Sequence, residues 1–436
     1  MPGLVAEESY DRFWQQFDVV RAALAQERDG APAIAIEAAT DNGVPLFVYE
    51  KSRLLFEDVT DSVDYMRGRF GADRITEAGP GVHLADLGGG DALGVLRDLE
   101  AERGGGWATP HHILSITGDV NLCPADEPTL PLPGGPMFYP TTVDHHAGDG
   151  VRIEIIDTGL AQGWERFTWL AGITGDDRLT PPPGEVPMYY GHGTFVAGVL
   201  RRVAPMAAVH VANNLRRAGA LHEVNLVEAL SRIMSYDDDQ LPHIISLSAG
   251  GSTRDDLPLL SIHRQLSNLQ SRGVLLVAAA GNDGNDRGFW PAAFEGVLSV
   301  GALREDLTGR ACFSNHGSWV DCYAPGERLV NAFPDGAYRY YHEGRETCRY
   351  RRRSDPAWYA GCTCVTAPNA GTTVQLRGRA RWSGTSFATP IVAGLVAARM
   401  SASGDSSRDA ADWLLANPAG WHPELGPVLL PGQAIR

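Results

Sequence analysis

The sequence contains little cysteine and no long apolar run, and both absences narrow the possible classes of protein. Six of its 436 residues are cysteines, so the fold does not require a disulfide framework, and in a reducing compartment these residues would be thiols. No stretch approaches the roughly 20 uninterrupted apolar residues that a transmembrane helix requires. The sequence therefore predicts a globular protein without a membrane span.

Positive charge is also scarce. Lysine and arginine total 37 against 53 acidic residues, which gives a formal net charge of −16. This balance argues against a general affinity for nucleic acid or anionic membranes, so we expect no nucleic-acid partner. Acidic residues such as Glu7, Glu8 and Asp11 interrupt the apolar residues of the N-terminal segment. No signal peptide is visible there, and we expect a cytoplasmic protein.

Residues 1–121 are predicted to form a small α+β domain. Its first helix carries an apolar stripe, because Tyr10, Phe13, Trp14 and Phe17 follow the i, i+3, i+4, i+7 spacing. Strand-like and helical patterns then alternate, at 45–50, 58–68, 82–87, 91–103 and 111–116. Residues 122–147, rich in proline and glycine, are predicted to form an extended linker.

From residue 148 onward the pattern is typical of an α/β domain. Five short, nearly continuous apolar runs lie at 151–157, 208–213, 243–248, 274–281 and 297–303, as in strands that are covered on both faces of a parallel sheet. Helical patterns separate them, at 192–203, 222–236 and 257–272. Repetition of strand, helix and strand predicts a mostly parallel sheet with right-handed crossovers.

Four polar residues stand at predicted strand ends or helix starts: Asp157, His192, Asn282 and Ser386. Each alone has an ordinary interpretation as a turn or capping residue. Together they supply a serine nucleophile, an imidazole base, a carboxylate that orients the base and an amide that stabilises an oxyanion. This set predicts acyl-transfer chemistry.

The motifs around these residues identify a family resemblance. The sequence reads DTG at 157–159, GHGTFVAG at 191–198, AAGN at 279–282 and GTSFATP at 384–390. In these motifs and their order, residues 148–433 resemble the subtilisin-like (subtilase) serine peptidases. The resemblance implies a three-layer α/β fold, a serine endopeptidase with Ser386 as nucleophile, and an oxyanion hole formed by Asn282 and the Ser386 backbone N–H. It implies no cofactor.

The resemblance also assigns substrate-binding residues. A peptide substrate would add as a strand along Ser248, Ala249 and Gly250, and Ala278, Ala279 and Ala280 would form the far wall of the specificity pocket. An ordinary strand end is the alternative for both segments. Pro390 is interpreted as lying in the first helical turn, where a missing N–H is harmless.

The sequence departs from the family in three places. The loop that holds calcium in many relatives is missing after His192, so we expect no metal. The loop after Asn282 is short, and Asp283, Asp286 or Arg287 either reach the pocket or face solvent. An insertion at 331–381 interleaves arginine with aromatic residues, which predicts a solvated hairpin or, alternatively, a docking surface for an acidic partner.

This insertion contains Cys348, Cys362 and Cys364, and either Cys312 or Cys322 could join them in space. The spacing matches no recognised zinc motif, so thiols are expected, with a disulfide or a metal site as alternatives.

The sequence allows more than one role for the N-terminal domain and more than one function for the whole chain. Subtilases commonly carry a pro-domain that assists folding and blocks the active site, so residues 1–121 are inhibitory, recruiting or a scaffold. In the inhibitory case, cleavage is expected between 122 and 150. A peptide ligase or macrocyclase, and a binding module without catalysis, are the alternatives to an endopeptidase.

Overall fold

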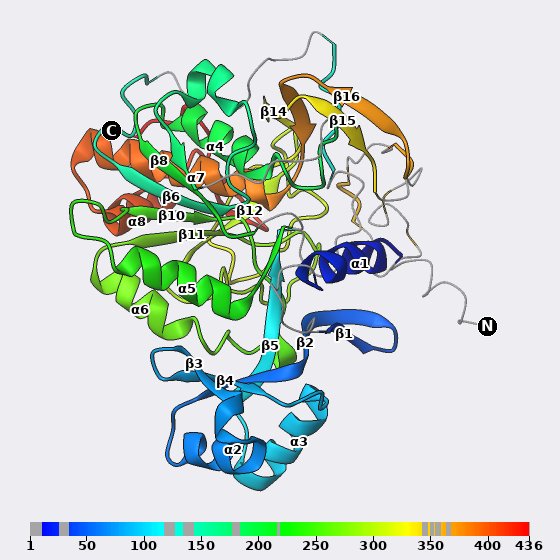
Figure 1. Ribbon diagram of the computed structural model, residues 1–436. Helices are drawn as coiled ribbons and strands as arrows, with labels where there is room; N and C mark the ends of the chain where they lie inside the picture. Colours follow the sequence, from blue (N-terminus) through cyan, green and yellow to red (C-terminus); the bar gives the residue numbers. More distant parts are fainter. Residues whose placement is uncertain are drawn as a thin grey trace.

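The computed structural model describes two units that differ in architecture (Figure 1). The described residues are 11–25, 35–116, 127–133, 144–176, 184–215, 219–341, 348, 353, 359–362 and 368–435. Most of the predicted linker, together with Cys123 and Cys364, therefore lies outside the described residues. The N-terminal unit is the smaller lobe below the larger unit in Figure 1.

The N-terminal unit is an antiparallel sheet with two helices packed on it. Its strands are ordered β3-β4-β2-β5, and β1 pairs with β2. Phe56, Met66 and Leu99 form part of its core, between the sheet and helices α2 and α3. The element bounds are α1 (Asp11–Ala25), β1 (Ile36–Asp41), β2 (Val44–Glu57), α2 (Ser62–Phe70), a 3₁₀ turn (Ala72–Arg74), β3 (Ile75–Gly79), β4 (Val82–Asp86), α3 (Ala92–Arg103) and β5 (Ala108–Ser115).

Helix α1 lies beside this sheet and follows the predicted apolar stripe only in part. Phe13 and Phe17 are buried, and they pack with Ile36 and Ile113. Trp14 is 39% exposed, so the prediction that it belongs to the buried stripe is wrong.

The larger unit is built on a sheet of nine strands. Their order is β18-β19-β13-β12-β11-β10-β6-β8-β7, and every pair is parallel except β18 with β19. The apolar runs explain this arrangement, because every residue of β10, β11 and β12 is buried. The bounds are β6 (Arg152–Asp157), β7 (Thr174–Gly175), β8 (Ala208–Asn213), β10 (Ile244–Leu247), β11 (Leu275–Ala279), β12 (Leu298–Leu303), β13 (Cys322–Pro325), β18 (Gly420–His422) and β19 (Gly426–Val428).

Helices cover both faces of this sheet and complete three layers, as predicted. Helices α4 (His192–Val203) and α7 (Thr385–Ser403) pack together on one face, and α5 (Glu223–Met234) and α6 (His263–Ser271) cover the other (Figure 1). Helix α8 (Ser407–Ala416) packs against α7. Three 3₁₀ turns lie at Trp164–Arg166, Thr168–Leu170 and Arg254–Asp256. Among the described helices, none is long and apolar enough to cross a membrane.

The described part of the 331–381 insertion is a pair of antiparallel ladders. Strand β14 (Leu329–Ala332) pairs with β17 (Arg379–Trp382), and β15 (Gly336–Arg339) pairs with β16 (Thr373–Leu376). Tyr338 and Tyr340 are buried, and their hydroxyls donate to Glu127 Oε1 and to the Pro128 carbonyl oxygen. A hairpin was expected here, but the expectation that these rings are solvated is wrong.

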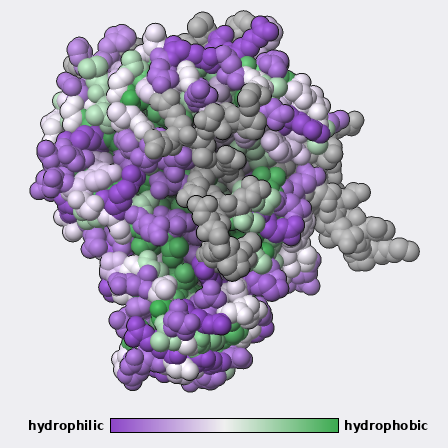
Figure 2. Space-filling model, viewed as in Figure 1, coloured by the Kyte–Doolittle hydropathy of each residue, from purple (hydrophilic) through white to green (hydrophobic). Residues whose placement is uncertain are grey.

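The face of the molecule that Figure 2 shows is mainly polar where residues are described. Figure 2 shows hydrophilic residues over most of the visible face, with apolar residues in small separate areas. This surface agrees with the strongly negative net charge of the sequence.

Candidate active site

The imidazole of His192 and the carboxylate of Asp157 form a buried hydrogen-bonded pair. His192 Nδ1 lies 2.8 Å from Asp157 Oδ1 and 2.9 Å from Oδ2. Asp157 Oδ1 also accepts a hydrogen bond of 2.7 Å from the Thr158 backbone N–H. Because Nδ1 donates to the carboxylate, the lone pair of the neutral ring is on Nε2, where a base must have it.

Local sequence explains how these two side chains meet. Asp157 is the last residue of β6, and His192 is the first residue of α4. The next residue, Gly193, lies so close to the β6 end that a Cβ would come 2.4 Å from the Gly159 carbonyl oxygen. Gly193 of the GHG motif thus allows the helix and the strand end to touch, because it has no side chain at the contact. Gly159 of the DTG motif has a positive φ of 72°, which glycine adopts readily.

Ser386 is the second residue of α7 and is buried. Its Oγ donates a hydrogen bond of 3.4 Å to the Ser248 carbonyl oxygen. Its own carbonyl oxygen accepts a bond of 3.1 Å from Ser248 Oγ. The nucleophile predicted from the sequence is therefore held at both its hydroxyl and its carbonyl group by Ser248.

This arrangement corrects the interpretation of Pro390. Pro390 is the sixth residue of α7, not part of the first turn. A residue with an N–H at this position would donate to the carbonyl oxygen of Ser386, four residues earlier, and proline cannot. Ser248 Oγ supplies the hydrogen bond that Pro390 withholds.

Asn282 has its side-chain oxygen fixed by Thr385. The Thr385 backbone N–H and Oγ1 contact Asn282 Oδ1 at 2.9 and 3.0 Å. Thr385 Oγ1 also accepts from the Gly281 N–H at 3.2 Å. With the oxygen thus occupied, the amide group Nδ2 is turned the other way, where it donates to the Ile116 carbonyl oxygen at 3.3 Å. Thr385 was not among the site residues predicted from the sequence, although it stands inside the GTS motif.

His192 and Ser386 make no direct hydrogen bond with each other. Within the described part of the chain, no hydrogen-bond partner contacts His192 Nε2, which is buried. The imidazole packs edge-on against Trp382 with ring centroids 5.2 Å apart, and lies 5.3 Å from the ring of Phe387, the residue after Ser386. These apolar rings fix the imidazole and exclude water from the site.

The end of strand β5 occupies the edge that was predicted to bind substrate. The Ser115 N–H donates to the Gly250 carbonyl oxygen at 2.7 Å, and the Gly250 N–H donates back to Ser115 at 3.0 Å. On its other side, β5 pairs with β9 (Ala220–His222), and the Ile116 N–H donates to the Gly219 carbonyl oxygen at 2.8 Å. A strand of the N-terminal unit thus lies between Gly250 and strand β9 of the larger unit, and the residue after it, Ile116, bonds to Asn282.

The other predicted substrate-binding residues are buried. Ser248 and Ala249 precede the paired Gly250, whose Cβ, if present, would come 2.5 Å from the Phe289 ring. Ala278, Ala279 and Ala280 are buried at the end of β11. The sequence left open whether Arg287 reaches the pocket or faces solvent. Its guanidinium donates to the Leu46 carbonyl oxygen of the N-terminal unit at 3.2 Å and to the Asp256 carboxylate.

Two buried glutamates join the N-terminal unit to the larger unit next to β5. Glu50 Oε1 lies 2.6 Å from His222 Nδ1 and Glu50 Oε2 lies 3.3 Å from His111 Nδ1. Burial alone would raise the pKa of Glu50, but His111 and His222 lower it below its usual range. Burial would likewise raise the pKa of Glu223, but hydrogen bonds from His112 and Ser261 lower it below its usual value. A cavity of about 540 Å³, lined in part by Glu50, His111 and His222, opens at this interface.

The backbone fixes the tautomers of the two β5 histidines. The Val224 N–H donates to His111 Nε2 and the Arg254 N–H donates to His112 Nε2, each at 3.3 Å. Both rings therefore carry their proton on Nδ1, which points at a glutamate. Since Nδ1 of His111 has no lone pair to offer, the Glu50–His111–His222 group is a cluster of histidines turned toward a carboxylate and does not suit a metal.

Comparison with known proteins places this geometry in a family. The model of the subtilase family, Peptidase_S8, matches residues 148–425. The chain belongs to the subtilase family. Subtilisin Savinase of Lederbergia lenta is 28% identical over 200 residues, which are 44% of this chain and 69% of that protein. Thermitase of Thermoactinomyces vulgaris is 29% identical over 215 residues, 46% of this chain and 71% of that protein.

These relatives support a serine-type endopeptidase, although several curated relatives are covered only in part. The extracellular serine proteinase of a Thermus species is 31% identical, over 48% of both chains. Among solved structures, the prenylagaramide maturation protease PagA is 23% identical over 65% of this subtilase and 92% of that chain, with a TM-score of 0.47. A cold-adapted subtilisin-like serine proteinase is 21% identical, and the match covers 72% of this chain and 98% of that chain with a TM-score of 0.47. These scores are low, so the assignment rests on the family match and the curated relatives.

Proposed function

We propose that this subtilase is a serine endopeptidase in which Ser386 attacks the peptide carbonyl and forms an acyl-enzyme. His192 accepts the proton from Ser386 Oγ through Nε2 and later donates it to the leaving amine. Asp157 stabilises the imidazolium that forms, because its carboxylate accepts from Nδ1 at 2.8 Å. Water then hydrolyses the ester, with His192 again acting as the base.

Asn282 and the Ser386 backbone N–H stabilise the oxyanion in this proposal. The single observation that carries it is the Asn282 amide, which donates to a peptide carbonyl, that of Ile116, at 3.3 Å. An amide whose oxygen is already bonded to Thr385 needs no reorganisation when negative charge develops on that carbonyl. The hydroxyl of Ser386 must turn from Ser248 to His192 for attack, as is common in resting sites whose hydrogen bonds tighten only in the reactive complex.

The N-terminal unit acts as an inhibitory pro-domain in the same proposal. Its strand β5 makes main-chain hydrogen bonds on both sides of the cleft, as an extended peptide substrate would. While it is bound, another peptide has no edge to pair with. Because Asn282 donates to the Ile116 carbonyl oxygen, we expect cleavage directly after residue 116 or at the next peptide bond. This position lies upstream of the 122–150 region in which cleavage was predicted from the sequence.

Intact mass and N-terminal sequencing of the wild type beside Ser386→Ala test the proposal. The wild type should contain a fragment that begins at residue 117 or 118, and Ser386→Ala should remain one chain. Ser115→Pro removes the N–H that bonds to Gly250 and should open the site to other peptides. The proposal would be contradicted if the wild type stays intact and the Ser115→Pro chain also cleaves no unfolded protein.

The products formed from an added peptide separate hydrolysis from ligation. Hydrolysis adds one water to the summed mass of the products, whereas ring closure or transfer to an amine adds none. Products without added water would replace the endopeptidase with a ligase, and binding without any covalent change would favour a silent binding module.

A further inference from the structure

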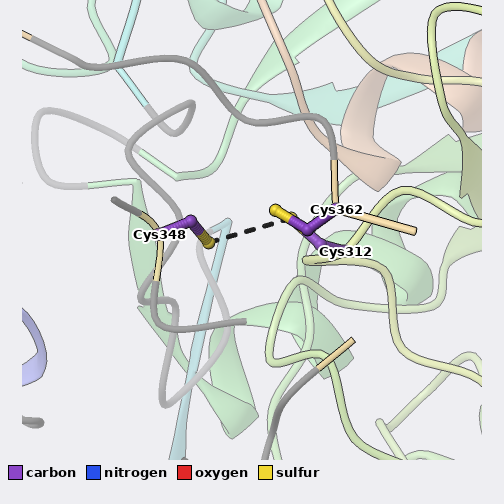
Figure 3. Close-up of side chains that lie close together, drawn as sticks. All are labelled: Cys312, Cys348 and Cys362. Carbon is purple, nitrogen blue, oxygen red and sulfur yellow. Dashed lines mark hydrogen bonds between the residues drawn. The ribbon is translucent and has the colours of Figure 1, made fainter. Parts of the chain in front are cut away.

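Two cysteines of the insertion, Cys348 and Cys362, converge with Cys312, which precedes it in the sequence. The Sγ atoms of Cys312, Cys348 and Cys362 all lie within 4.8 Å of one another, and each residue is buried. Figure 3 shows the three sulfurs turned toward each other, with Cys348 approaching from the side opposite Cys312 and Cys362. Cys322, the other candidate from the sequence, is absent from this group and instead donates to the Ser299 carbonyl oxygen at 3.8 Å.

The spacing of the sulfurs fits a thiolate metal site better than a disulfide. Cys312 Sγ and Cys348 Sγ are 3.9 Å apart, whereas a disulfide bond is about 2.05 Å long. Two sulfurs bound to one tetrahedral zinc at about 2.3 Å each lie about 3.8 Å apart. Three sulfurs within 4.8 Å of one another can supply three corners of such a tetrahedron, and a fourth ligand would come from outside this set.

Positive charge beside the cluster matches the charge of such a site. Three thiolates and one divalent cation leave one net negative charge. Arg310 Nη1 donates to the Cys312 carbonyl oxygen at 3.1 Å, and its guanidinium lies 4.6 Å from the centre of the Tyr359 ring. Arg304 Nη1 donates at 2.6 Å to the carbonyl oxygen of Gly361, the residue before Cys362. The two guanidinium groups thus hold two of the ligand-bearing segments. Arg304 is also paired with the Asp306 carboxylate at 3.1 Å, so Arg310 is the one that offsets the charge of the site.

The cluster lies on a loop that supports the oxyanion residue. After Cys312, the Phe313 carbonyl oxygen accepts from the Gly284 N–H at 2.8 Å. Asn315 Oδ1 accepts from the Asp283 N–H at 2.9 Å, and Asn315 Nδ2 donates to the Ala280 carbonyl oxygen at 2.8 Å. Backbone on both sides of Asn282 is therefore fastened to this loop.

We propose that Cys312, Cys348 and Cys362 bind a thiophilic divalent cation of the zinc class, which fastens the insertion to the loop behind Asn282. On binding, each thiol loses its proton to solvent as its sulfur bonds to the metal, so three protons are released per ion and no redox partner is needed.

Metal retention by the uncleaved Ser386→Ala chain tests this proposal. The reduced chain is loaded with Zn²⁺, freed of excess by gel filtration and analysed for metal. About one ion per chain should be retained, Cys348→Ser should lose it, and the matched control Cys322→Ser, with its thiol buried outside the cluster, should keep it. Equal retention by Cys348→Ser and Cys322→Ser would overturn the proposal.

Two further measurements use the Ser386→Ala chain itself, the parent of the cysteine variants, so they do not depend on whether a cysteine variant folds. Addition of Zn²⁺ at constant pH should release about three protons per ion, and Co²⁺ should give the intense near-ultraviolet absorption of thiolate ligation. The proposal would be overturned if the reduced parent chain retains no metal. It would also be overturned if the isolated protein contains a Cys312–Cys348 disulfide and binds no metal after reduction.

Discussion

Thr385 fixes the side-chain oxygen of Asn282 through two hydrogen bonds, one from its backbone N–H and one from its hydroxyl. The residue before the proposed nucleophile therefore sets the direction of the proposed oxyanion donor. Nucleophile and donor lie on different segments, α7 and the loop after β11, and this contact couples their positions.

Replacement of Thr385 by valine should lower kcat about 10- to 100-fold with little change in KM. Removal of an oxyanion donor commonly costs about 10²- to 10³-fold, and Asn282→Ala should show that larger loss, whereas Thr385→Val keeps the amide but loosens it. Steady-state kinetics on a short peptide substrate measure both.

Thr389→Val is the matched control for this substitution. Thr389 is equally buried one turn later in α7, and its hydroxyl donates to the Thr385 carbonyl oxygen instead of to Asn282. If Thr389→Val lowers kcat as much as Thr385→Val does, the loss reflects helix packing, and the orienting role of Thr385 is wrong.

Ser248 and Pro390 form a compensating pair that a double-mutant cycle can detect. Ser248→Ala leaves the buried Ser386 carbonyl oxygen without the bond it accepts at 3.1 Å, which should cost about 1–3 kcal/mol of unfolding free energy. In a Pro390→Ala chain, the new N–H supplies a helical bond to that carbonyl, so the same change should cost much less. Denaturant unfolding in the Ser386→Ala background measures the cycle, and an equal cost in both backgrounds would exclude the compensation.

Acidification should weaken the attachment of the N-terminal unit through Glu50. Since docking lowers the pKa of Glu50, its contribution is complete above the ordinary value of 4.5 and is lost as the pH falls toward the lower docked value. Arg53, His111 and His222 face this carboxylate. Glu50→Gln should therefore lower Tm by several degrees at pH 7, and the difference should shrink as the pH falls below 4.5.

Thermal unfolding of the uncleaved Ser386→Ala chain between pH 3 and 7 measures this effect. Glu77→Gln is the control, because Glu77 lines the same cavity but is exposed. A Glu50→Gln difference that stays constant with pH, or that Glu77→Gln reproduces, would refute the assignment.

The meeting of Asp157 and His192 could be predicted from the sequence, because both stand in motifs whose order matches the subtilases, and the two side chains are hydrogen-bonded in the structure. The strands of the larger unit were equally predictable, because continuous apolar runs leave few alternatives to a covered parallel sheet.

Long-range pairing was not predictable in the same way. Strand β9 has three residues, too few for a periodic pattern, yet it pairs with β5 and extends the sheet of the N-terminal unit into the larger one. The roles of Thr385 and Pro390 depend on partners more than 100 residues away, Asn282 and Ser248. A cytoplasmic location remains a prediction from the sequence.

The central claim, that Ser386 is a nucleophile activated by His192, is tested most directly by labelling with a fluorophosphonate probe and mapping the modified peptide. A chain freed of its N-terminal unit by its own cleavage should carry one adduct, on Ser386. His192→Ala, assayed beside Ser386→Ala after proteolytic removal of residues 1–116, should label at least about 10³-fold more slowly, and Ser386→Ala should not label. An adduct on another serine, or equally fast labelling without His192, would contradict the account.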